Sequence, residues 1–391
     1  MQHSDYPIKT IGQFNDSFPP IMDGVAVTVA NYAYWLYRMH QPVCVVTPKT
    51  PDYILEEPYP VHRYNSLPLI LRKPYRIGMP DLDISFRNTL ERIPFSLVHA
   101  HCPFTSGHVA QRIAHERNIP LIATFHSKYR QDFENTFLNK KVADIMVKEV
   151  VKFYEKADQV WVPQAAVEET LREYGYKGKV EVVDNGNDFS GEENYKPTRQ
   201  SSREFLGLQT DETVFLFVGQ HIWEKNTRMI IESLALLTEL PFKMYFAGTG
   251  YAAEEMHQLV ENAGLSNKVT FTGVISDREL LKKYYAAADL MIFPSVYDNA
   301  PLVVREAAAM KTPAILVENS TASEIVTDKV NGFLTPNSPE SLAEKLKELA
   351  ANKAMLHAAG ENAANTIARS WENVVEEVYD RYKSCIKNHK S

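Results

Sequence analysis

Short apolar runs alternate with helix-like segments along the whole chain, and this alternation constrains the fold most. The first half contains the runs VAVTV, PVCVVTP, FSLVHAH, PLIATFH, QVWVP and VEVV, and the second half TVFLFVGQ, FKMYFAG, KVTFTG, DLMIFPS and TPAILVE. Continuous apolar strands separated by helices indicate parallel sheets covered on both faces. Two such series predict an α/β chain with two doubly wound domains. The polar segment GEENYKPTRQSS places the join so that the domains span residues 1–195 and 196–370.

The composition excludes several classes of protein. A chain of 391 residues is long enough for two domains, each with its own core. It has no apolar run of about 18 residues, and its polar N-terminus lacks the apolar core of a signal peptide. Three widely spaced cysteines exclude a disulfide framework and a cysteine-based zinc site. We therefore expect a cytoplasmic protein, with the inner face of the membrane left open as its place of action.

The stretch from Phe293 to Glu324, FPSVYDNAPLVVREAAAMKTPAILVENSTASE, predicts a ligand site beside a helix. Asp298 precedes the helix and Glu306 lies within it, so two carboxylates can accept hydrogen bonds from hydroxyls. The N–H groups of the first helical residues, Leu302 and Val303, can hold a phosphate. A nucleotide sugar carries both kinds of group. The alternative is that the two acids only cap and solvate the helix.

Further candidates follow other strands, because ligands of doubly wound sheets bind at the carboxyl ends of the strands. After FLFVG come Gln220 and then Lys225, at a helix start where a cation can bind a diphosphate, with Arg228 as a second candidate. The strand KVTFTG is followed by Val274, whose backbone can face a nucleotide base.

Two candidates in the first half have plain structural alternatives. Gly24 opens a helix after a proline-rich loop, so its backbone can approach a phosphate, although a mere turn would look the same. His126 follows the strand PLIATF, where it can donate a hydrogen bond or exchange a proton. A structural histidine is equally compatible with that position.

Two groups of residues imitate metal sites. His99, His101 and His108 lie close in sequence, but no carboxylate accompanies them at helical spacing, so packing or substrate contact is favoured. Asp81 and Asp83 form a DxD sequence, for which a capping or surface role is favoured. We expect no metal and no cofactor, and a nucleotide sugar would be a co-substrate.

Most of the candidates for binding a second substrate, the acceptor of a group from the nucleotide sugar, are basic. Arg72, Lys73 and Arg76 lie among Leu, Ile and Tyr, a mixture suited to contact with an amphiphile at a membrane surface. His101 and Arg130 are further acceptor-side candidates. The alternative is a solvated face of mixed charge. With a net charge of −7, the whole chain does not suggest a nucleic-acid partner.

The series FPSVYDNAPLVVREAAAMKTPAI, SEIV and NGFL resembles the C-terminal signature of family 4 of the glycosyltransferases, which have the GT-B fold. Asp298 and Glu306 match its E-x7-E spacing. Supporting matches run in the family's order over nearly the whole chain: SFPPIMDGVAVTVANYAYWL, VHAHCPFTSG, IATFHSKYR, DNGND, VGQHIWEKN, FAGTG, FTGVIS and SWENVVEEVYDRY.

The resemblance implies two Rossmann-like domains that face each other across a cleft, and a C-terminal helix, residues 371–391, that returns to the first domain. It implies transfer of a sugar with retention at the anomeric carbon and without a required metal. Gly24 and Lys225 would then bind the donor diphosphate. His126 and Asp298 would contact the donor sugar, and Glu306 the ribose.

Three positions depart from the family pattern. Gln220 replaces an arginine, Asp298 replaces a glutamate, and Pro301 replaces a glycine and has no N–H. The main hypothesis is a retaining glycosyltransferase that uses a nucleotide sugar, UDP-linked in preference to GDP-linked, with a lipid or glycan precursor as acceptor. Alternatives are a non-catalytic GT-B-shaped binding protein and a nucleotide-sugar epimerase. The absence of a full G-x-G-x-x-G disfavours a dehydrogenase.

Overall fold

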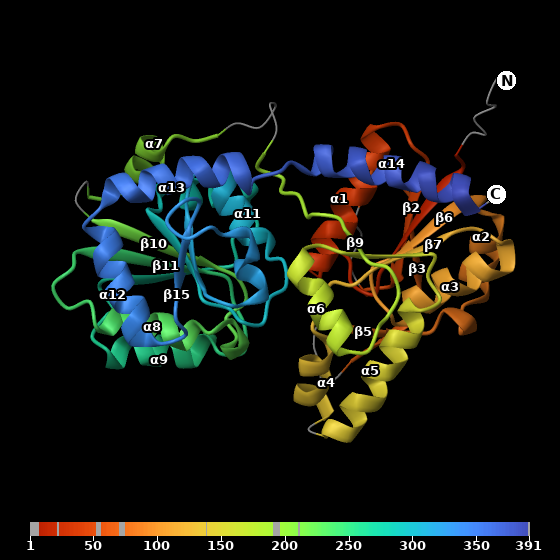
Figure 1. The fold of residues 1–391 in the computed structure, drawn as a ribbon, viewed down its shortest axis with the longest axis horizontal. Helices are drawn as coiled ribbons and strands as arrows, with labels where there is room; N and C mark the ends of the chain where they lie inside the picture. The colour runs from red at the N-terminus through yellow and green to blue at the C-terminus, as the bar shows by residue number, and fades with distance from the viewer. Residues whose placement is uncertain are drawn as a thin grey trace. The chain divides into compact units, whose positions relative to one another are not determined.

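A computed structural model describes residues 8–21, 23–51, 56–69, 75–137, 139–190, 196–209 and 212–389 (Figure 1). Its internal contacts divide the chain into two compact units. Unit 1 comprises Met1–Asn185 and Trp371–Ser391, and unit 2 comprises Gly186–Ser370. The chain thus passes into unit 2 after Asn185, whereas the sequence places the join after residue 195. Among the described residues, no helix is both long and apolar enough to cross a membrane.

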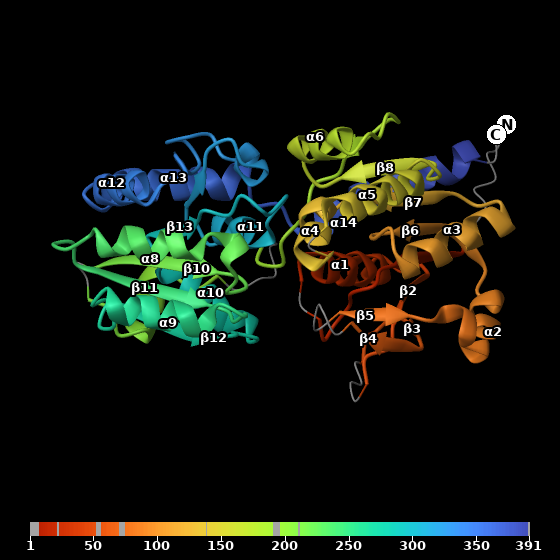
Figure 2. The ribbon, with the colours of Figure 1, turned by 90° about the horizontal axis from the view of Figure 1, so that it is seen from below.

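Unit 1 is built on a parallel sheet with the strand order β3-β2-β1-β6-β7-β8-β9. Its strands are β1 (Thr10–Phe14), β2 (Val43–Pro48), β3 (Val61–Tyr64), β6 (Phe95–Ala100), β7 (Leu121–Thr124), β8 (Gln159–Val162) and β9 (Glu181–Val182). An antiparallel pair, β4 (Ser66–Pro68) and β5 (Arg76–Gly78), lies at the β3 side of the unit, away from β8 (Figure 2).

The helices of unit 1 include one from the far end of the chain. They are α1 (Gly24–Arg38), η2 (Pro80–Leu82), α2 (Ile84–Arg92), α3 (Thr105–Arg117), α4 (Tyr129–Phe137), α5 (Lys140–Tyr154), α6 (Ala165–Glu173) and α14 (Trp371–His389). Helix α14 buries Trp371 and Tyr382, and the Tyr382 ring stacks on Trp161 of β8 at 5.7 Å. The C-terminal helix is therefore part of the unit 1 core.

Unit 2 has a second parallel sheet, with the order β12-β11-β10-β13-β14-β15. Its strands are β10 (Thr213–Val218), β11 (Phe242–Ala247), β12 (Val269–Gly273), β13 (Leu290–Phe293), β14 (Ala314–Val317) and β15 (Phe333–Thr335). Its helices are α7 (Arg199–Phe205), η3 (Trp223–Lys225), α8 (Thr227–Ala235), α9 (Ala253–Asn262), α10 (Arg278–Ala287), α11 (Leu302–Ala309), η4 (Thr321–Ile325), α12 (Pro339–Ala350) and α13 (Lys353–Thr366).

Helices cover both faces of the unit 2 sheet. Figure 1 shows α7, α11 and α13 on one face and α8 and α9 on the other. The central strands read as continuous buried runs, such as VFLF in β10 and LMIF in β13. Strands buried on both faces need apolar residues at every position, not at alternate ones. The predicted doubly wound α/β fold is confirmed in each unit.

One predicted strand is wrong. The run VAVTV, residues 25–29, forms the first turns of α1 and not a strand. The carboxylate of Asp23 caps this helix by accepting a hydrogen bond from the Ala26 N–H at 2.8 Å. An N-cap at this point outweighs the strand preference of valine, which depends strongly on context. The first strand of the sheet is the unrecognised run TIGQF, which is β1.

The DxD sequence has structural roles. A carboxylate oxygen of Asp83 caps α2 by accepting from the Phe86 N–H at 3.0 Å. Asp81 accepts a hydrogen bond from Arg112 at 2.6 Å. Both contacts agree with the capping and surface roles that the sequence favours. Among the described residues, no group of three or more His, Cys, Asp or Glu side chains is arranged to hold a metal ion.

Candidate active site

The loops after β10 and β13 bring Lys225 and Asp298 together in unit 2. The Lys225 ammonium donates to both carboxylate oxygens of Asp298, at 2.6 and 2.8 Å. The two side chains are only 13% and 18% exposed. The Lys225 ammonium also lies 5.5 Å from the centre of the Phe293 ring. A cation and an anion therefore share a sheltered position at the carboxyl ends of two neighbouring strands, where ligands of such sheets bind.

Glycines allow the surrounding loops to approach closely. A Cβ atom at Gly248 would lie 1.9 Å from the carbonyl oxygen of Gly219, and Gly248 has a φ of +138°. A Cβ atom at Gly219 would lie 3.4 Å from Cδ of Lys225. The loop after β11 therefore packs directly on the backbone of the loop after β10. Side chains at these positions would displace the loop that carries Lys225.

Asn226 fixes the neighbouring turn. Its φ of 58° is left-handed, a conformation that asparagine tolerates better than most residues. Its side-chain amide donates to the carbonyl of Pro294 at 3.2 Å and to the side chain of Asn337 at 2.9 Å. The loops after three strands of the sheet are thereby joined beside Lys225.

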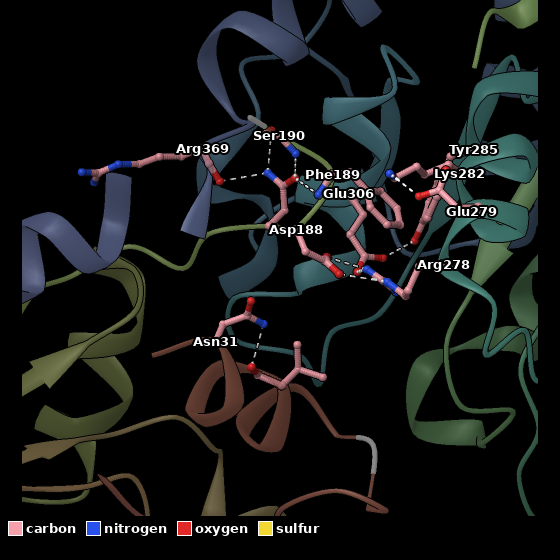
Figure 3. A network of polar contacts seen from close by, with 12 residues as sticks. Asn31, Asp188, Phe189, Ser190, Arg278, Glu279, Lys282, Tyr285, Glu306 and Arg369 are labelled. Atoms are coloured by element: carbon pink, nitrogen blue, oxygen red, sulfur yellow. Dashed lines mark hydrogen bonds and ion pairs between the residues drawn. The ribbon is translucent and has the colours of Figure 1, made fainter. Parts of the chain in front are cut away.

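Glu306 projects from the second turn of α11 into a polar network (Figure 3). One carboxylate oxygen accepts from Arg278 at 2.7 Å, and the other accepts from the Tyr285 hydroxyl at 2.8 Å. Arg278 also donates to Asp188, at 2.9 and 2.5 Å. Burial, followed by the charge of Glu306, raises the pKa of Tyr285 well above its ordinary value, so this phenol remains a donor.

The other predicted donor-site residues of unit 2 lie at the same edge of its sheet. Gln220 is exposed in the loop after β10. Val274 is exposed directly after β12. Leu302 and Val303 are the first residues of α11, and Pro301 at the cap position offers no side-chain hydrogen bond to their N–H groups.

Gly24 is the first residue of α1 in unit 1. A Cβ atom built there would meet no atom within 4 Å. The neighbouring protein therefore does not require glycine at this position. A requirement for glycine would have to come from something that approaches the helix start.

His126 of unit 1 lies at the partly buried end of a chain of hydrogen bonds. His101 Nε2 lies 2.8 Å from the side-chain oxygen of Gln13, and His101 Nδ1 lies 3.1 Å from His126 Nε2. The Gln13 amide donates to the Tyr382 hydroxyl at 3.1 Å, and that hydroxyl lies 2.6 Å from His99 Nδ1. The network thus extends from β1 and α14 to the residue after β7.

The directions of these bonds fix the histidine tautomers. Because the Gln13 oxygen only accepts, His101 Nε2 carries a proton and His101 Nδ1 is an acceptor. His126 Nε2 must then carry the proton that it donates to His101. The Tyr382 hydroxyl accepts from Gln13 and donates to His99 Nδ1. His126 is accordingly held as a neutral ring protonated on Nε2.

Burial keeps these rings neutral. It lowers the pKa of His126 to about 3. Burial, reinforced by the neighbouring histidines, also lowers the pKa of His99 and of His101 well below the ordinary value. A cation in this apolar position would lose its hydration, and a second cation beside it would be repelled. The network is therefore uncharged at neutral pH.

The predicted acceptor-side residues that the structure describes have separate partners. Arg76 donates to the hydroxyl of Ser66 at 2.7 Å and to its carbonyl at 2.9 Å, within the β4–β5 pair. Arg130 forms an ion pair with Asp144 at 2.5 Å. Arg72 and Lys73 lie outside the described residues. His101 is buried and uses both ring nitrogens within the network, so it does not present a free group to an acceptor.

Several residues of these networks are not identified from the sequence alone. They are Gln13, Asn226, Arg278, Tyr285 and Tyr382. Arg278 carries the only usable signal, because it follows the helix-capping Asp277 in a strand–loop–helix segment whose backbone was already a candidate. Gln13 lies in the strand that the sequence pattern missed.

Comparisons with known proteins cover both units. The family described as Glycosyltransferase Family 4 matches residues 22–190, and the family described as Glycosyl transferases group 1 matches residues 198–366. The chain is 27% identical to the alpha-monoglucosyldiacylglycerol synthase of Streptococcus pneumoniae over 368 residues, 87% of this chain and 82% of that protein. It is 26% identical to the D-inositol 3-phosphate glycosyltransferase of Streptomyces bingchenggensis, over 76% and 68% of the two chains.

Solved structures share the whole architecture. Sucrose-phosphate synthase from Thermosynechococcus elongatus superposes with a TM-score of 0.83 at 22% identity, over 97% of this chain and 100% of that one. HepE from Anabaena, solved in complex with UDP and glucose, superposes with a TM-score of 0.76 at 18% identity, over 96% and 100%. At these identities the likeness concerns the fold.

Proposed function

The chain belongs to family 4 of the glycosyltransferases, with their GT-B fold, and on this basis we propose that it moves a hexosyl group from a nucleotide sugar to a hydroxyl acceptor with retention at the anomeric carbon. The observation that carries the proposal is the sheltered pair of Lys225 and Asp298 at the carboxyl ends of β10 and β13. It joins a cation suited to a diphosphate and a carboxylate suited to sugar hydroxyls.

The chemistry assigns the residues of unit 2 to parts of the donor. Cleavage of the bond between the sugar and the diphosphate leaves negative charge on the diphosphate and positive character on the sugar. Lys225 and the N–H groups of Leu302 and Val303 stabilise the diphosphate. Asp298 accepts hydrogen bonds from the sugar, and Glu306 from the ribose. The backbone at Val274 faces the base, and Gln220 adds a polar contact.

Gly24 and His126 complete the assignment in unit 1. The open space beside Gly24 supports an approach of the donor diphosphate to its backbone N–H. His126 contacts the transferred sugar as a neutral ring, supported by His101. Since Lys225 and helix N–H groups neutralise the leaving group, the reaction does not require a metal. An unchanged rate in excess EDTA is the expected result.

The donor is proposed to be UDP-linked and the acceptor a lipid or glycan precursor. The Anabaena protein HepE has been crystallised with UDP and with UDP-glucose, and the Streptococcus pneumoniae relative is a glucosyldiacylglycerol synthase. In this chain, Leu67 and Ile77 face each other across the β4–β5 pair and are 56% and 52% exposed. Exposed apolar side chains beside Arg76 support contact with an anionic membrane surface.

A thermal-shift screen tests the donor. UDP-, GDP- and ADP-sugars and NAD are compared, and a ligand at a hundredfold excess over its dissociation constant stabilises by about 2.7 kcal/mol. Stabilisation by a UDP-sugar is the expected result. Stabilisation by NAD alone would overturn the proposal. For the membrane contact, replacing Arg72, Lys73 and Arg76 by serine should weaken binding to vesicles that contain anionic lipid, and unchanged binding would refute it.

The named relatives, which are glycosyltransferases, favour an active enzyme over a non-catalytic binding protein. The family departures at Gln220 and Pro301 leave Lys225 and Asp298 in contact. Release of UDP together with a glycosylated acceptor distinguishes a transferase from both a binding protein and an epimerase, because an epimerase converts the donor without an acceptor.

A further inference from the structure

The carboxylate of Glu306 is held on two sides. Its side chain is buried, and its two oxygens accept from Arg278 and from Tyr285 at 2.7 and 2.8 Å (Figure 3). A buried carboxylate without such partners would be costly. The two donors therefore fix its orientation.

Arg278 bridges two carboxylates. Its Nε and Nη2 donate to the two oxygens of Asp188 at 2.9 and 2.5 Å, and the same Nη2 donates to Glu306. Its guanidinium lies over the Phe189 ring at 4.3 Å from the centroid. Only a planar, forked cation can bridge and stack in this way.

Asp188 is itself anchored. It lies in the segment by which the chain enters unit 2, next to the fully buried Phe189. The backbone and side-chain N–H groups of Asn187 both donate to the Arg369 carbonyl at 2.9 Å. The Asn187 oxygen accepts from the N–H groups of Phe189 and Ser190 at 2.9 and 2.8 Å. The connecting segment therefore acts as a fixed support for Arg278.

We propose that Arg278 is a positioning residue for the donor nucleotide: braced by Asp188 and Phe189, it aims the Glu306 carboxylate at the ribose hydroxyls. The inference rests on the proposed role of Glu306. A carboxylate offers about four lone-pair positions, so two remain for the 2′ and 3′ hydroxyls. Tyr285 holds the second oxygen in the same way.

The test compares UDP with its 2′-deoxy and 3′-deoxy analogues by isothermal titration calorimetry. A hydrogen bond from a hydroxyl to a fixed carboxylate predicts a preference of the wild type for UDP of about tenfold to hundredfold. Glu306→Gln and Arg278→Met should each reduce this ratio towards one. Arg278→Lys should restore part of it, and Asp188→Asn should reduce it by less than Arg278→Met.

Arg199→Met is the matched control. Arg199 also pairs with a carboxylate of unit 2, that of Asp289, and its side chain is 42% exposed, against 39% for Arg278. It does not contact Glu306. A general loss of stability would weaken the binding of all three nucleotides alike and leave the ratio of their affinities unchanged. The control variant should therefore retain the wild-type ratio.

The outcomes separate the two proposals. If no nucleoside diphosphate binds the wild type, the proposed function fails. If the wild type binds UDP and its deoxy analogues equally well, or if Glu306→Gln leaves the ratio of affinities unchanged, Glu306 does not bind the ribose. The proposed role of Arg278 is then refuted as well. If Glu306→Gln removes the preference but Arg278→Met does not, or Arg199→Met acts as strongly, only the role of Arg278 is refuted.

Discussion

The Lys225 ammonium donates to both carboxylate oxygens of Asp298, so that each candidate donor-site charge is neutralised by the other. A diphosphate carries more negative charge than one carboxylate and competes for the lysine. Its arrival would release Asp298 to accept hydrogen bonds from the sugar. The pair therefore holds two charges in a fixed orientation at a largely buried position.

Separating this pair should affect binding and turnover differently. Asp298→Asn frees Lys225, so UDP should bind as tightly as in the wild type or more tightly, while kcat falls because sugar contacts are lost. Lys225→Ala should weaken UDP binding and lower kcat by about a hundredfold to a thousandfold, as for the removal of one charge-stabilising donor. Titration calorimetry and steady-state rates give both quantities.

Lys243→Ala is a control for these variants, because Lys243 is a half-buried lysine of β11 that donates to the Asn267 carbonyl. It should leave UDP affinity and kcat unchanged. Much weaker UDP binding by Asp298→Asn would show that Asp298 does not compete with the donor for Lys225.

Gly24→Ala should separate stability from function. The added methyl group meets no protein atom within 4 Å, and alanine is favoured over glycine in a helix by roughly 0.5–1 kcal/mol. The melting temperature should hold or rise, while donor KM increases because the methyl group occupies the space proposed for the diphosphate. Gly264→Ala is the converse control, since its φ of +70° should make alanine destabilising without an effect on KM. An unchanged donor KM in Gly24→Ala would show that the donor diphosphate does not approach Gly24.

Tyr382→Phe should alter the histidine network from the C-terminal helix. The loss of the hydroxyl leaves the Gln13 amide without its acceptor, so the amide can rotate and present its NH2 group to His101. We expect His126 to lose its fixed Nε2–H tautomer and kcat to fall several-fold. Two-bond 1H–15N spectra of histidine-labelled protein report the tautomer directly.

Tyr379→Phe is the matched control on the same helix, because the Tyr379 hydroxyl donates to Gln41 and not to the network. It should leave both the spectra and the rate unchanged. An unaltered His126 tautomer in Tyr382→Phe would contradict the proposed chain of hydrogen bonds.

Stability should fall as the solution is acidified below pH 6.5. An unfolded histidine binds a proton near pH 6.5, whereas His126 stays neutral in the folded protein down to about pH 3. The unfolded chain therefore binds more protons within this window, and the free energy of unfolding decreases as the pH falls. Between pH 6.5 and 5, the free energy of unfolding should decrease by about 2 kcal/mol for one histidine of this kind. Urea unfolding at both pH values measures it, and an unchanged midpoint would contradict the assigned burial.

The sequence predicts the fold better than the contacts within the site. Apolar runs such as TVFLFV and LMIF identify buried strands because parallel sheets bury both faces. Lys225, in the loop after β10, and Val274, directly after β12, lie at the expected edge of the sheet. The run VAVTV is wrongly predicted as a strand because Asp23 caps a helix that begins at this point.

The missed residues act across large sequence separations. Arg278 reaches Asp188, 90 residues away, and Gln13 reaches Tyr382, 369 residues away. No local period encodes such partners. Likewise, the sequence nominated His101 for the acceptor side, but only the fold reveals that its ring is buried and fully used.

Sugar transfer should depend on Lys225 and Asp298. Proton NMR of the complete reaction tests this dependence most directly. The purified chain is incubated with UDP-glucose and vesicles that contain a lipid with a free hydroxyl group, and the anomeric signals are followed over time. We predict equal amounts of UDP and of a new glycoside whose anomeric configuration matches that of the donor, with both formed about a hundredfold to a thousandfold more slowly by Lys225→Ala. An inverted product, or transfer at the wild-type rate by Lys225→Ala, would contradict the account.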